Sequence, residues 1–295
     1  MMMQRTRPLA PRRGVALLVS ALTLTASGAA GTALVAPAQA AAATVQTTSA
    51  NWAGYAVRRT GVRFRTVSGT WTVPRVDCSD GVSRSSANWV GIGGYSPTAR
   101  ALEQLGTESD CTRGGREVYS AWFEVVPDSA TTSRLTVTPG DTVRASVQVR
   151  GTLVTMKLAD LARGTSQTRV VRADTVDQTS AEWIVEAPSI CSGDTIGDAN
   201  CRQTALANFG TTGFSAARAT TSAGHTGTVA DPTWTTVAIV LRAQARGGPG
   251  FLNGHGGPPP NATAGGATPG ALDVTGGAFS VAFGETQAVS PAAPA

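Results

Sequence analysis

The sequence predicts an all-β protein, built of antiparallel sheet in a sandwich or a barrel. Short segments in which apolar and polar residues alternate recur along the chain, a pattern typical of strands that bury one face. The chain contains 34 glycines and 16 prolines, which favour the turns between such strands. After residue 40, no segment keeps a convincing helical period over three turns. Many short strands separated by turns indicate a sandwich or a barrel.

Residues 1–40 have the layout of a secretory signal peptide. Four arginines precede an apolar run from residue 14 to about residue 35, and Ala38-Gln39-Ala40 then offers a small-x-small cleavage site. A membrane anchor is the alternative, but the run contains Thr, Ser and Gly, and no basic stop follows it. We therefore expect export by the Sec or the twin-arginine route, cleavage after Ala40, and a secreted protein. Residues 41–50 are then a short pro-segment or an N-terminal extension.

Removal of the signal peptide changes the charge of the chain. It leaves 295 − 40 = 255 residues with a formal net charge of (24 − 4) − 19 = +1, because residues 1–40 contain four arginines and no acidic residue. No basic cluster remains that would indicate binding to nucleic acid. We expect one large domain and a monomer, with no stable membrane association after cleavage.

Strand patterns follow one another through residues 51–245, which we expect to form the domain. Prolines 74 and 127 end two of the strands, and Arg150-Gly151 joins two others in a hairpin. The expected strands are 62–67, 70–73, 118–126, 135–138, 142–149, 153–158, 170–171, 182–186 and 233–241.

The C-terminal part of the chain has a different composition. Residues 246–270 are rich in Gly and Pro and poor in core residues, so we expect a disordered insertion or linker there. Residues 279–283 alternate again and predict a final strand within 271–295, with an unstructured tail as the alternative.

Four cysteines in an exported chain favour two disulfides. Cys191 and Cys201 flank a polar, turn-rich loop and are the first pair expected; Cys78 and Cys111 follow by elimination. No Cys-x-x-Cys pair exists, which argues against a zinc cluster.

Several common catalytic motifs are missing from the sequence. His225 and His255 lie among Gly and Thr with no Gly-x-Ser-x-Gly elbow, and no His-Glu-x-x-His or Asp-Thr-Gly is present. No phosphate loop or dinucleotide fingerprint occurs either. We expect no metal and no cofactor, and the remaining candidates for chemistry are carboxylates and amides.

Five short motifs occur in one order along the chain. They are Asn51-Trp-Ala-Gly-Tyr55, Trp89-Val-Gly-Ile-Gly-Gly94, Ala101-Leu-Glu-Gln-Leu-Gly-Thr-Glu108, Tyr119-Ser-Ala-Trp-Phe-Glu-Val-Val-Pro127 and Ala181-Glu-Trp-Ile-Val-Glu186. Together they resemble the glutamic peptidases (eqolisins), acid endopeptidases that use a Gln–Glu dyad, from about residue 51 to about residue 214. The resemblance implies a lectin- or glucanase-like sandwich of two packed antiparallel sheets, with protein or peptide substrates. It also implies Gln104 and Glu186 as the catalytic pair.

The residue types suit those roles. Alternation in a strand puts Glu182, Ile184 and Glu186 on one face and Trp183 and Val185 on the other. A half-buried carboxylate has a raised pKa, which suits a general base or acid below neutral pH. The resemblance assigns Glu186 to activating a water and then protonating the leaving amine. An amide both donates and accepts hydrogen bonds, so Gln104 could hold the water and stabilise the oxyanion.

The resemblance also implies residues that surround the dyad. Three tryptophans and two glutamates fall at matching positions of the cleft, although each tryptophan by itself would be assigned to the core: Trp52, Trp89, Trp122, Glu124 and Glu108. Gly93 and Ser120 stand where fungal members carry acidic residues, so the acid network must differ. We expect a milder acid optimum than in those members.

Two other functions are open on the residues alone. A β-sandwich glycoside hydrolase would use Glu182 and Glu186, but four residues along a strand span about 13 Å, against carboxyl separations of about 5 Å or ~6.5–9.5 Å in such enzymes. A non-catalytic, lectin-like binding module would use the tryptophans as sugar platforms and would leave Gln104 and Glu186 without a role.

Overall fold

The all-β prediction is confirmed in the computed structural model, which describes residues 44–191, 201–242 and 265–285. Within these ranges every regular element is a strand, and no helix is long and apolar enough to cross a membrane. The expected signal peptide lies outside the described residues, as do residues 246–264 of the expected insertion.

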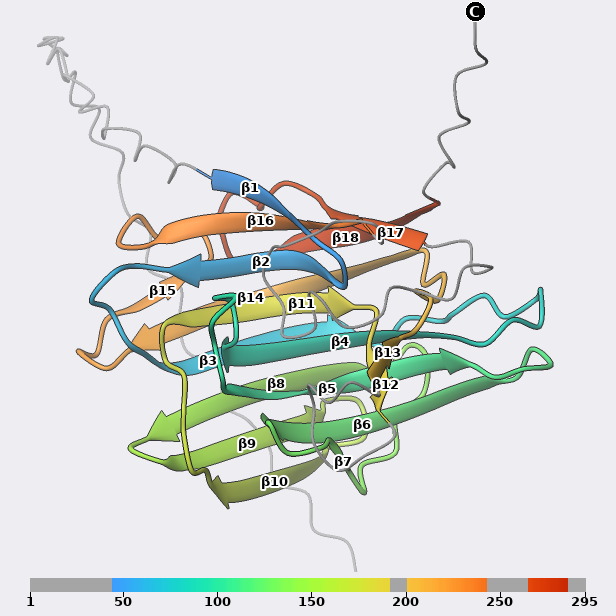
Figure 1. Cartoon of the computed structure of the whole chain (residues 1–295), viewed down its shortest axis with the longest axis horizontal. Coiled ribbons are helices and arrows are strands. Elements are labelled where there is room, and N and C mark those ends of the chain that lie inside the picture. The colour runs from blue at the N-terminus through green and yellow to red at the C-terminus, as the bar shows by residue number, and fades with distance from the viewer. Residues whose placement is uncertain (1–43, 192–200, 243–264, 286–295) are drawn as a thin grey trace, which may run out of the picture. The chain divides into compact units, whose positions relative to one another are not determined.

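One continuous sheet folds over itself to make the two layers of the sandwich (Figure 1). The first layer begins at one end of the sheet and contains, in spatial order, β10 (Thr165–Arg172), β9 (Leu153–Asp160), β8 (Thr142–Arg150), β3 (Phe64–Thr72) and β14 (Thr211–Thr221). The path then turns over through β18 (Phe279–Glu285) and β17 (Gly265–Pro269).

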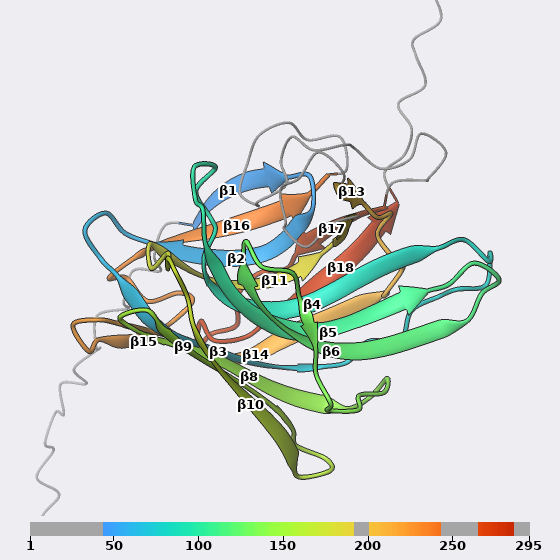
Figure 2. The same cartoon turned by 60° about the horizontal axis from the view of Figure 1, so that its bottom comes forward.

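The second layer returns over the first and carries most of the matched motifs. Its strands, in spatial order, are β16 (Thr235–Leu241), β2 (Trp52–Arg58), β11 (Ser180–Glu186), β4 (Arg84–Gly93), β5 (Leu102–Cys111), β6 (Glu117–Val126) and β7 (Thr131–Thr132). Three further elements lie beside this path: β1 (Thr44–Ser49) pairs in parallel with β16, β15 (Thr226–Thr228) pairs with β14, and β12 (Ser189–Cys191) pairs with β13 (Cys201–Gln203). Figure 2 shows how the sheet curves through β4, β5 and β6.

The two layers meet in a large apolar core because the strands alternate their faces. On β11, Trp183 and Val185 point into this core, whereas Ile184 packs in a separate apolar cluster on the outer face. The core also contains buried hydrogen bonds between the layers. The indole N–H of Trp183 donates to the backbone oxygen of Ser68 at 2.8 Å, and that of Trp71 donates to Thr107 Oγ1 at 2.9 Å. The outer face of β11 and its neighbours is left to form the site.

The sheet extends beyond the predicted domain of residues 51–245. β1 precedes that range, and β17 and β18 follow it within the same sheet. β18 contains the final strand expected at 279–283, and β17 lies inside the range expected to be disordered. Composition misleads there because the glycines serve close packing: a Cβ on Gly265 would lie 2.4 Å from the ring of Phe283.

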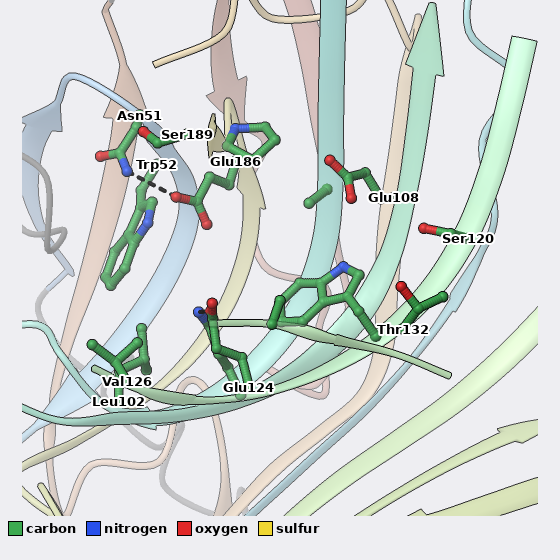
Figure 3. A pocket seen from close by; sticks show the side chains of 15 residues that line it. Asn51, Trp52, Leu102, Glu108, Ser120, Glu124, Val126, Thr132, Glu186 and Ser189 are labelled. Atoms are coloured by element: carbon green, nitrogen blue, oxygen red, sulfur yellow. Dashed lines mark hydrogen bonds between the residues drawn. The ribbon is translucent and has the colours of Figure 1, made fainter. Parts of the chain in front are cut away.

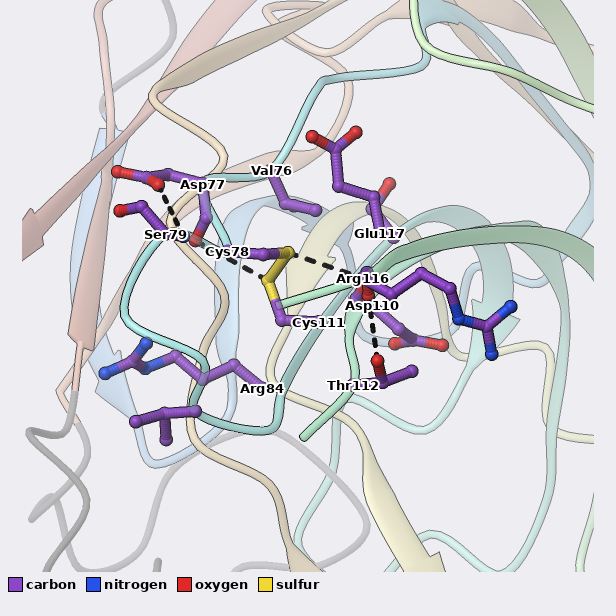
Figure 4. The surroundings of a disulfide bond; sticks show 12 residues. Val76, Asp77, Cys78, Ser79, Arg84, Asp110, Cys111, Thr112, Arg116 and Glu117 are labelled. Atoms are coloured by element: carbon purple, nitrogen blue, oxygen red, sulfur yellow. Dashed lines mark hydrogen bonds between the residues drawn. A yellow bond between two sulfur atoms is a disulfide. The ribbon is translucent and has the colours of Figure 1, made fainter. Parts of the chain in front are cut away.

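The expected disulfide between Cys78 and Cys111 is present (Figure 4). It joins the segment after β3 to the end of β5, with Cα atoms 5.3 Å apart. The pairing of β12 with β13 places Cys191 opposite Cys201. The described part of the structure does not include these two side chains, so their disulfide stays a prediction.

Candidate active site

A cavity of about 170 Å³ opens on the outer face of the second layer (Figure 3). Strands β2, β11, β4, β5 and β6 supply its floor, and the segments after β6 and β11 supply its rim. The cavity is lined by six of the seven residues that we expected in the dyad and the cleft: Gln104, Glu186, Trp52, Trp122, Glu124 and Glu108.

Strand register explains why these side chains converge. Glu186 of β11 lies opposite Ala87 of β4, which in turn lies opposite Glu108 of β5. Gln104 of β5 lies opposite Glu124 of β6. All of these positions share one face of the sheet, because side chains four residues apart on a strand point the same way. Small residues on β4 leave the space between them open. At Gly91, a Cβ would lie 2.9 Å from the ring of Trp89 and 3.3 Å from Gln104 Cβ.

Neutral hydrogen-bond donors hold the carboxylate of Glu186. Asn51 Nδ2 donates to Oε1 and Trp89 Nε1 donates to Oε2, each at 2.8 Å. Asn51 is itself fixed, because its Oδ1 accepts a hydrogen bond from Ser49 Oγ at 3.1 Å and its backbone oxygen accepts one from Ala187 N at 2.8 Å. The carboxylate therefore has a defined orientation toward the cavity.

The pKa of Glu186 is set by two opposing effects. Glu186 keeps some contact with solvent through the cavity, but protein surrounds its carboxyl group, and this burial raises the pKa to about 7. Hydrogen bonds from Trp89 and Asn51 favour the ionised form and oppose that rise, and the nearby indole N–H of Trp52 acts in the same direction. No cationic side chain contributes to this shift. A glutamate in this setting changes its protonation state near neutral pH, as a general base or acid must.

A hydrogen bond to Glu124, which lies opposite on β6, holds the side chain of Gln104. Its Nε2 donates to Glu124 Oε2, while its Oε1 is buried and has no hydrogen-bond partner among the described residues. Burial, followed by the negative charge of Glu186, raises the pKa of Glu124 to about 8, and the hydrogen bond from Gln104 opposes this rise. Glu124 is therefore a neutral acid at the pH at which Glu186 begins to ionise. A neutral Glu124 can donate a hydrogen bond to Gln104 as well as accept one from it.

Glu108 and Ser120 lie opposite each other on β5 and β6 and complete one wall of the cavity. Burial, followed by the nearby carboxylates of Asp110 and Glu186, raises the pKa of Glu108. Ser120 provides a hydroxyl at a position where fungal members carry an acid. The wall therefore has one carboxyl group rather than two.

The three tryptophans expected in the cleft have different positions. Trp52 and Trp122 line the cavity, but Trp89 is fully buried behind it and is not a lining residue. Its ring packs edge-on against that of Trp52, with centroids 5.0 Å apart, while its N–H holds Glu186. Trp89 thus supports the carboxylate rather than presenting a surface to a ligand. Sequence alone could not separate these roles, because all three residues occupy the same face of their strands.

Glu182 is buried away from the cavity. Its side chain is fully buried, and neither carboxyl oxygen has a hydrogen-bond partner among the described residues. This position does not favour a glycoside hydrolase that pairs Glu182 with Glu186. At Gly93, which departs from the acidic residue of the fungal pattern, a Cβ would lie 2.6 Å from Asp177. Asp177 fills that space and accepts a hydrogen bond from Gly94 N at 3.2 Å.

Sequence reasoning did not assign a role to Asn51, although it begins the first matched motif. It also missed the residues that complete the rim and floor, which come from both sides of the cavity: Ala87, Leu102, Val126, Ala130, Thr132, Pro188 and Ser189. The described residues contain no group of three or more His, Cys, Asp or Glu side chains placed to hold a metal ion.

We expect the Asn51→Ala variant to shift the acid limb of the pH–rate profile to higher pH. A hydrogen bond to a charged group is worth about 1.5–3 kcal/mol, so its loss should raise the pKa of Glu186 by about one to two units. Thr132→Ala, which removes another group from the cavity wall, serves as the control. An unchanged acid limb in a folded Asn51→Ala protein would contradict this positioning role.

A buried carboxyl and an amide in one cavity of a β-sandwich fit the class of acid peptidases that the motifs suggested. The chain matches the Peptidase A4 family over residues 50–244 and belongs to that family, the eqolisins or glutamic peptidases. A sequence comparison with curated proteins found no match.

Solved structures agree on the fold. Scytalido-glutamic peptidase, solved with a transition state analog inhibitor, is 23% identical and has a TM-score of 0.61, with 79% of this chain and 98% of that chain covered. SCP-B, a member of the eqolisin family solved in a complex with the tripeptide Ala-Ile-His, is 22% identical with a TM-score of 0.56 and the same coverage. The protein is therefore a glutamic endopeptidase by family, on the family's fold.

Proposed function

We propose that this protein hydrolyses peptide bonds with a Gln104–Glu186 dyad and a water activated by Glu186, without a covalent intermediate. The convergence of these two side chains on one cavity carries the proposal. In the first step, ionised Glu186 takes a proton from a water that attacks the scissile carbonyl. Protonated Glu186 then gives that proton to the leaving amine, so the glutamate returns to its starting state.

Gln104 would stabilise the oxyanion of the tetrahedral intermediate. This role needs an amide N–H that faces the substrate. In the structure, however, the amide atom of Gln104 without a hydrogen-bond partner is the acceptor Oε1. Neutral Glu124 offers a solution. If it donates a hydrogen bond to Oε1 with the amide turned over, Gln104 Nε2 becomes free to donate an N–H to the carbonyl oxygen. A positioned donor to a developing negative charge is a strong source of catalysis in a buried site.

We further propose that the enzyme acts outside the cell after residues 1–40 are removed. The signal layout of that segment supports this, and the two relatives solved with a transition state analog and a tripeptide support peptides as ligands of the cavity. The cavity is formed by residues after position 50. Loss of the signal would therefore leave it unchanged.

Digestion of denatured casein across about pH 3 to 9 would test the function. We expect cleavage with an optimum between about pH 7 and 8, because the rate should rise as Glu186, with a pKa of about 7, ionises and fall as Glu124, with a pKa of about 8, loses its proton. Activity should survive chelators, serine reagents, thiol alkylation and pepstatin. Hydrolysis of a polysaccharide panel without casein cleavage, or loss of cleavage with a chelator, would overturn the proposal.

A further inference from the structure

A second groove, of about 640 Å³, adjoins the catalytic cavity. Thr132 lines both of them, so the groove begins where the cavity wall formed by β7 ends. Its other wall comes from β10. We call it the arginine groove, after Arg134 and Arg169, which line it together with Leu135 and Gln167.

The groove lies where the two ends of the folded sheet meet (Figure 1). β7 and β10 are the terminal strands of the sheet path. Gln167 of β10 joins them, because its Oε1 accepts hydrogen bonds from Ser133 Oγ and from the backbone N–H of Arg134, both at 2.7 Å. Ser133 Oγ also accepts a hydrogen bond from Leu135 N at 3.0 Å. The walls are thus fixed to each other, and the arginines project from an ordered frame.

The charge of the groove is positive and uncompensated. Arg134 and Arg169 are both exposed, and neither takes part in any of the salt bridges of the described residues. No Asp or Glu lines the groove. A guanidinium presents a planar set of donors that matches a carboxylate, so the ligand that fits is an anionic side chain.

We propose that the arginine groove binds acidic side chains of the peptide substrate on one side of the scissile bond. This inference rests on the proposed peptidase function and names a substrate class for it. An extended peptide advances about 3.3 Å per residue, so a chain that leaves the cavity past Thr132 enters the groove within a few residues. The preference should depend on pH, because aspartate and glutamate lose their charge near pH 4.

A peptide series with one scissile core tests the proposal. Each peptide carries Asp, Asn, Lys or cysteic acid at one position, which is moved through four positions on either side of the cleaved bond. We expect kcat/KM at pH 5.5 to be about three- to tenfold higher for Asp than for Asn at one or two neighbouring positions, on one side only, because exposed ion pairs are worth up to about 1 kcal/mol each. At pH 3.5, cysteic acid should keep the advantage and Asp should lose it. Salt at 0.5 M should reduce both preferences.

Variants identify the residues responsible. Arg134→Gln and Arg169→Gln should each lower the preference, and the double variant should remove it, with the effect in KM and little change for the Asn peptides. Arg172→Gln is the matched control, since this arginine lies on β10 outside the groove and donates to Thr152 Oγ1. Equal hydrolysis of Asp and Asn peptides at every position, or a preference that persists in the folded double variant, would overturn the inference. Failure to cleave any peptide would instead count against the proposed function.

Discussion

Replacing Glu186 with glutamine should abolish peptide hydrolysis while the protein stays folded. The amide has nearly the shape of the carboxylate but cannot take a proton from water at any working pH. Removal of a positioned general base typically costs about 10²–10⁴ in rate. In this site the loss should be at the upper end, because the other two cavity glutamates are neutral acids in the same pH range. The measurement is kcat/KM on a fluorogenic peptide, with circular dichroism and the melting temperature as folding controls.

The hydrogen bonds around Glu186 make the fold control necessary. Both of its oxygens accept a hydrogen bond, so the NH₂ group of a glutamine would face either Asn51 Nδ2 or Trp89 Nε1, which are also donors. This mismatch should lower stability somewhat without unfolding a well-packed sandwich. Glu182→Gln is the matched control, since Glu182 is on the same strand and face but does not line the cavity. A folded Glu186→Gln protein that cleaves peptides at a near-normal rate would refute the dyad.

The Gln104→Ala variant completes this test. It removes the oxyanion donor but leaves the base, and loss of one such donor typically costs about 10²–10³ in rate. Because Glu186 remains, some activity should survive, with an unchanged acid limb of the pH–rate profile. Gln104→Glu, which places an acid beside Glu124, should be at least as impaired.

Much of the fold could be predicted from alternation, and two of the misses have a physical cause. The hairpin of β8 and β9 was predicted within two residues at each end, since each of these strands buries one face and exposes the other. β4 and β5 gave no such signal, because they are buried on both faces, by the core on one side and by the site on the other. Residues 135–138 alternate in burial, at Leu135 and Val137, yet form no strand. An alternating pattern therefore indicates that one face of a segment is buried, but not that a neighbouring strand pairs with it.

The site could be predicted only through the resemblance. Nothing in the local sequence of Gln104 distinguishes it from a surface glutamine, and its burial follows from strands that join it in space. The same limit applies to Asn51, whose role depends on a contact 135 residues away with Glu186. The arginine groove was not predicted for the same reason, since β7 and β10 are neighbours only because the sheet folds over itself.

The folded protein should be much less stable at pH 8 than at pH 4.5, because two carboxyl groups are buried outside the cavity. Glu103 and Glu182 are both fully buried. Glu103 accepts one hydrogen bond, from Asp177 N at 3.2 Å, and its Oε2 has no partner among the described residues. Burial raises the pKa of Glu103 from 4.5 to about 9 and raises the pKa of Glu182 well above its usual range, with the charge of Asp177 adding to both.

The direction of the effect follows from proton binding. Below about pH 4 both the folded and the unfolded chain hold these protons, and the groups do not affect stability. Above that pH the unfolded chain releases them while the folded protein keeps them, so the free energy of unfolding falls by about 1.4 kcal/mol per pH unit and per group. For Glu103 alone the loss is about 3 kcal/mol by pH 7, and it continues until its folded pKa of about 9 is reached. Domains are typically stable by only about 5–15 kcal/mol.

Urea denaturation at pH 4.5 and pH 8 measures this loss directly. Glu103→Gln and Glu182→Gln should each raise the free energy of unfolding at pH 8 and leave it nearly unchanged at pH 4.5, where the native glutamates are already neutral. Glu117→Gln is the control, because this glutamate is partly exposed and pairs with Arg75 at 2.8 Å. Equal stability of wild-type protein at the two pH values would disprove the argument.

The same variants separate two causes of inactivity at high pH. If activity falls above neutrality because the enzyme unfolds, Glu103→Gln should extend it to higher pH without moving the acid limb, which Glu186 sets. If activity falls because Glu124 ionises beside Gln104, the alkaline limb of the pH–rate profile should lie at the same pH in Glu103→Gln, even though this variant melts at a higher temperature. We expect the first result at 37 °C and above, where little stability remains, and the second at low temperature. Buried acids that the chemistry does not use would then set the upper pH limit of the enzyme through its fold.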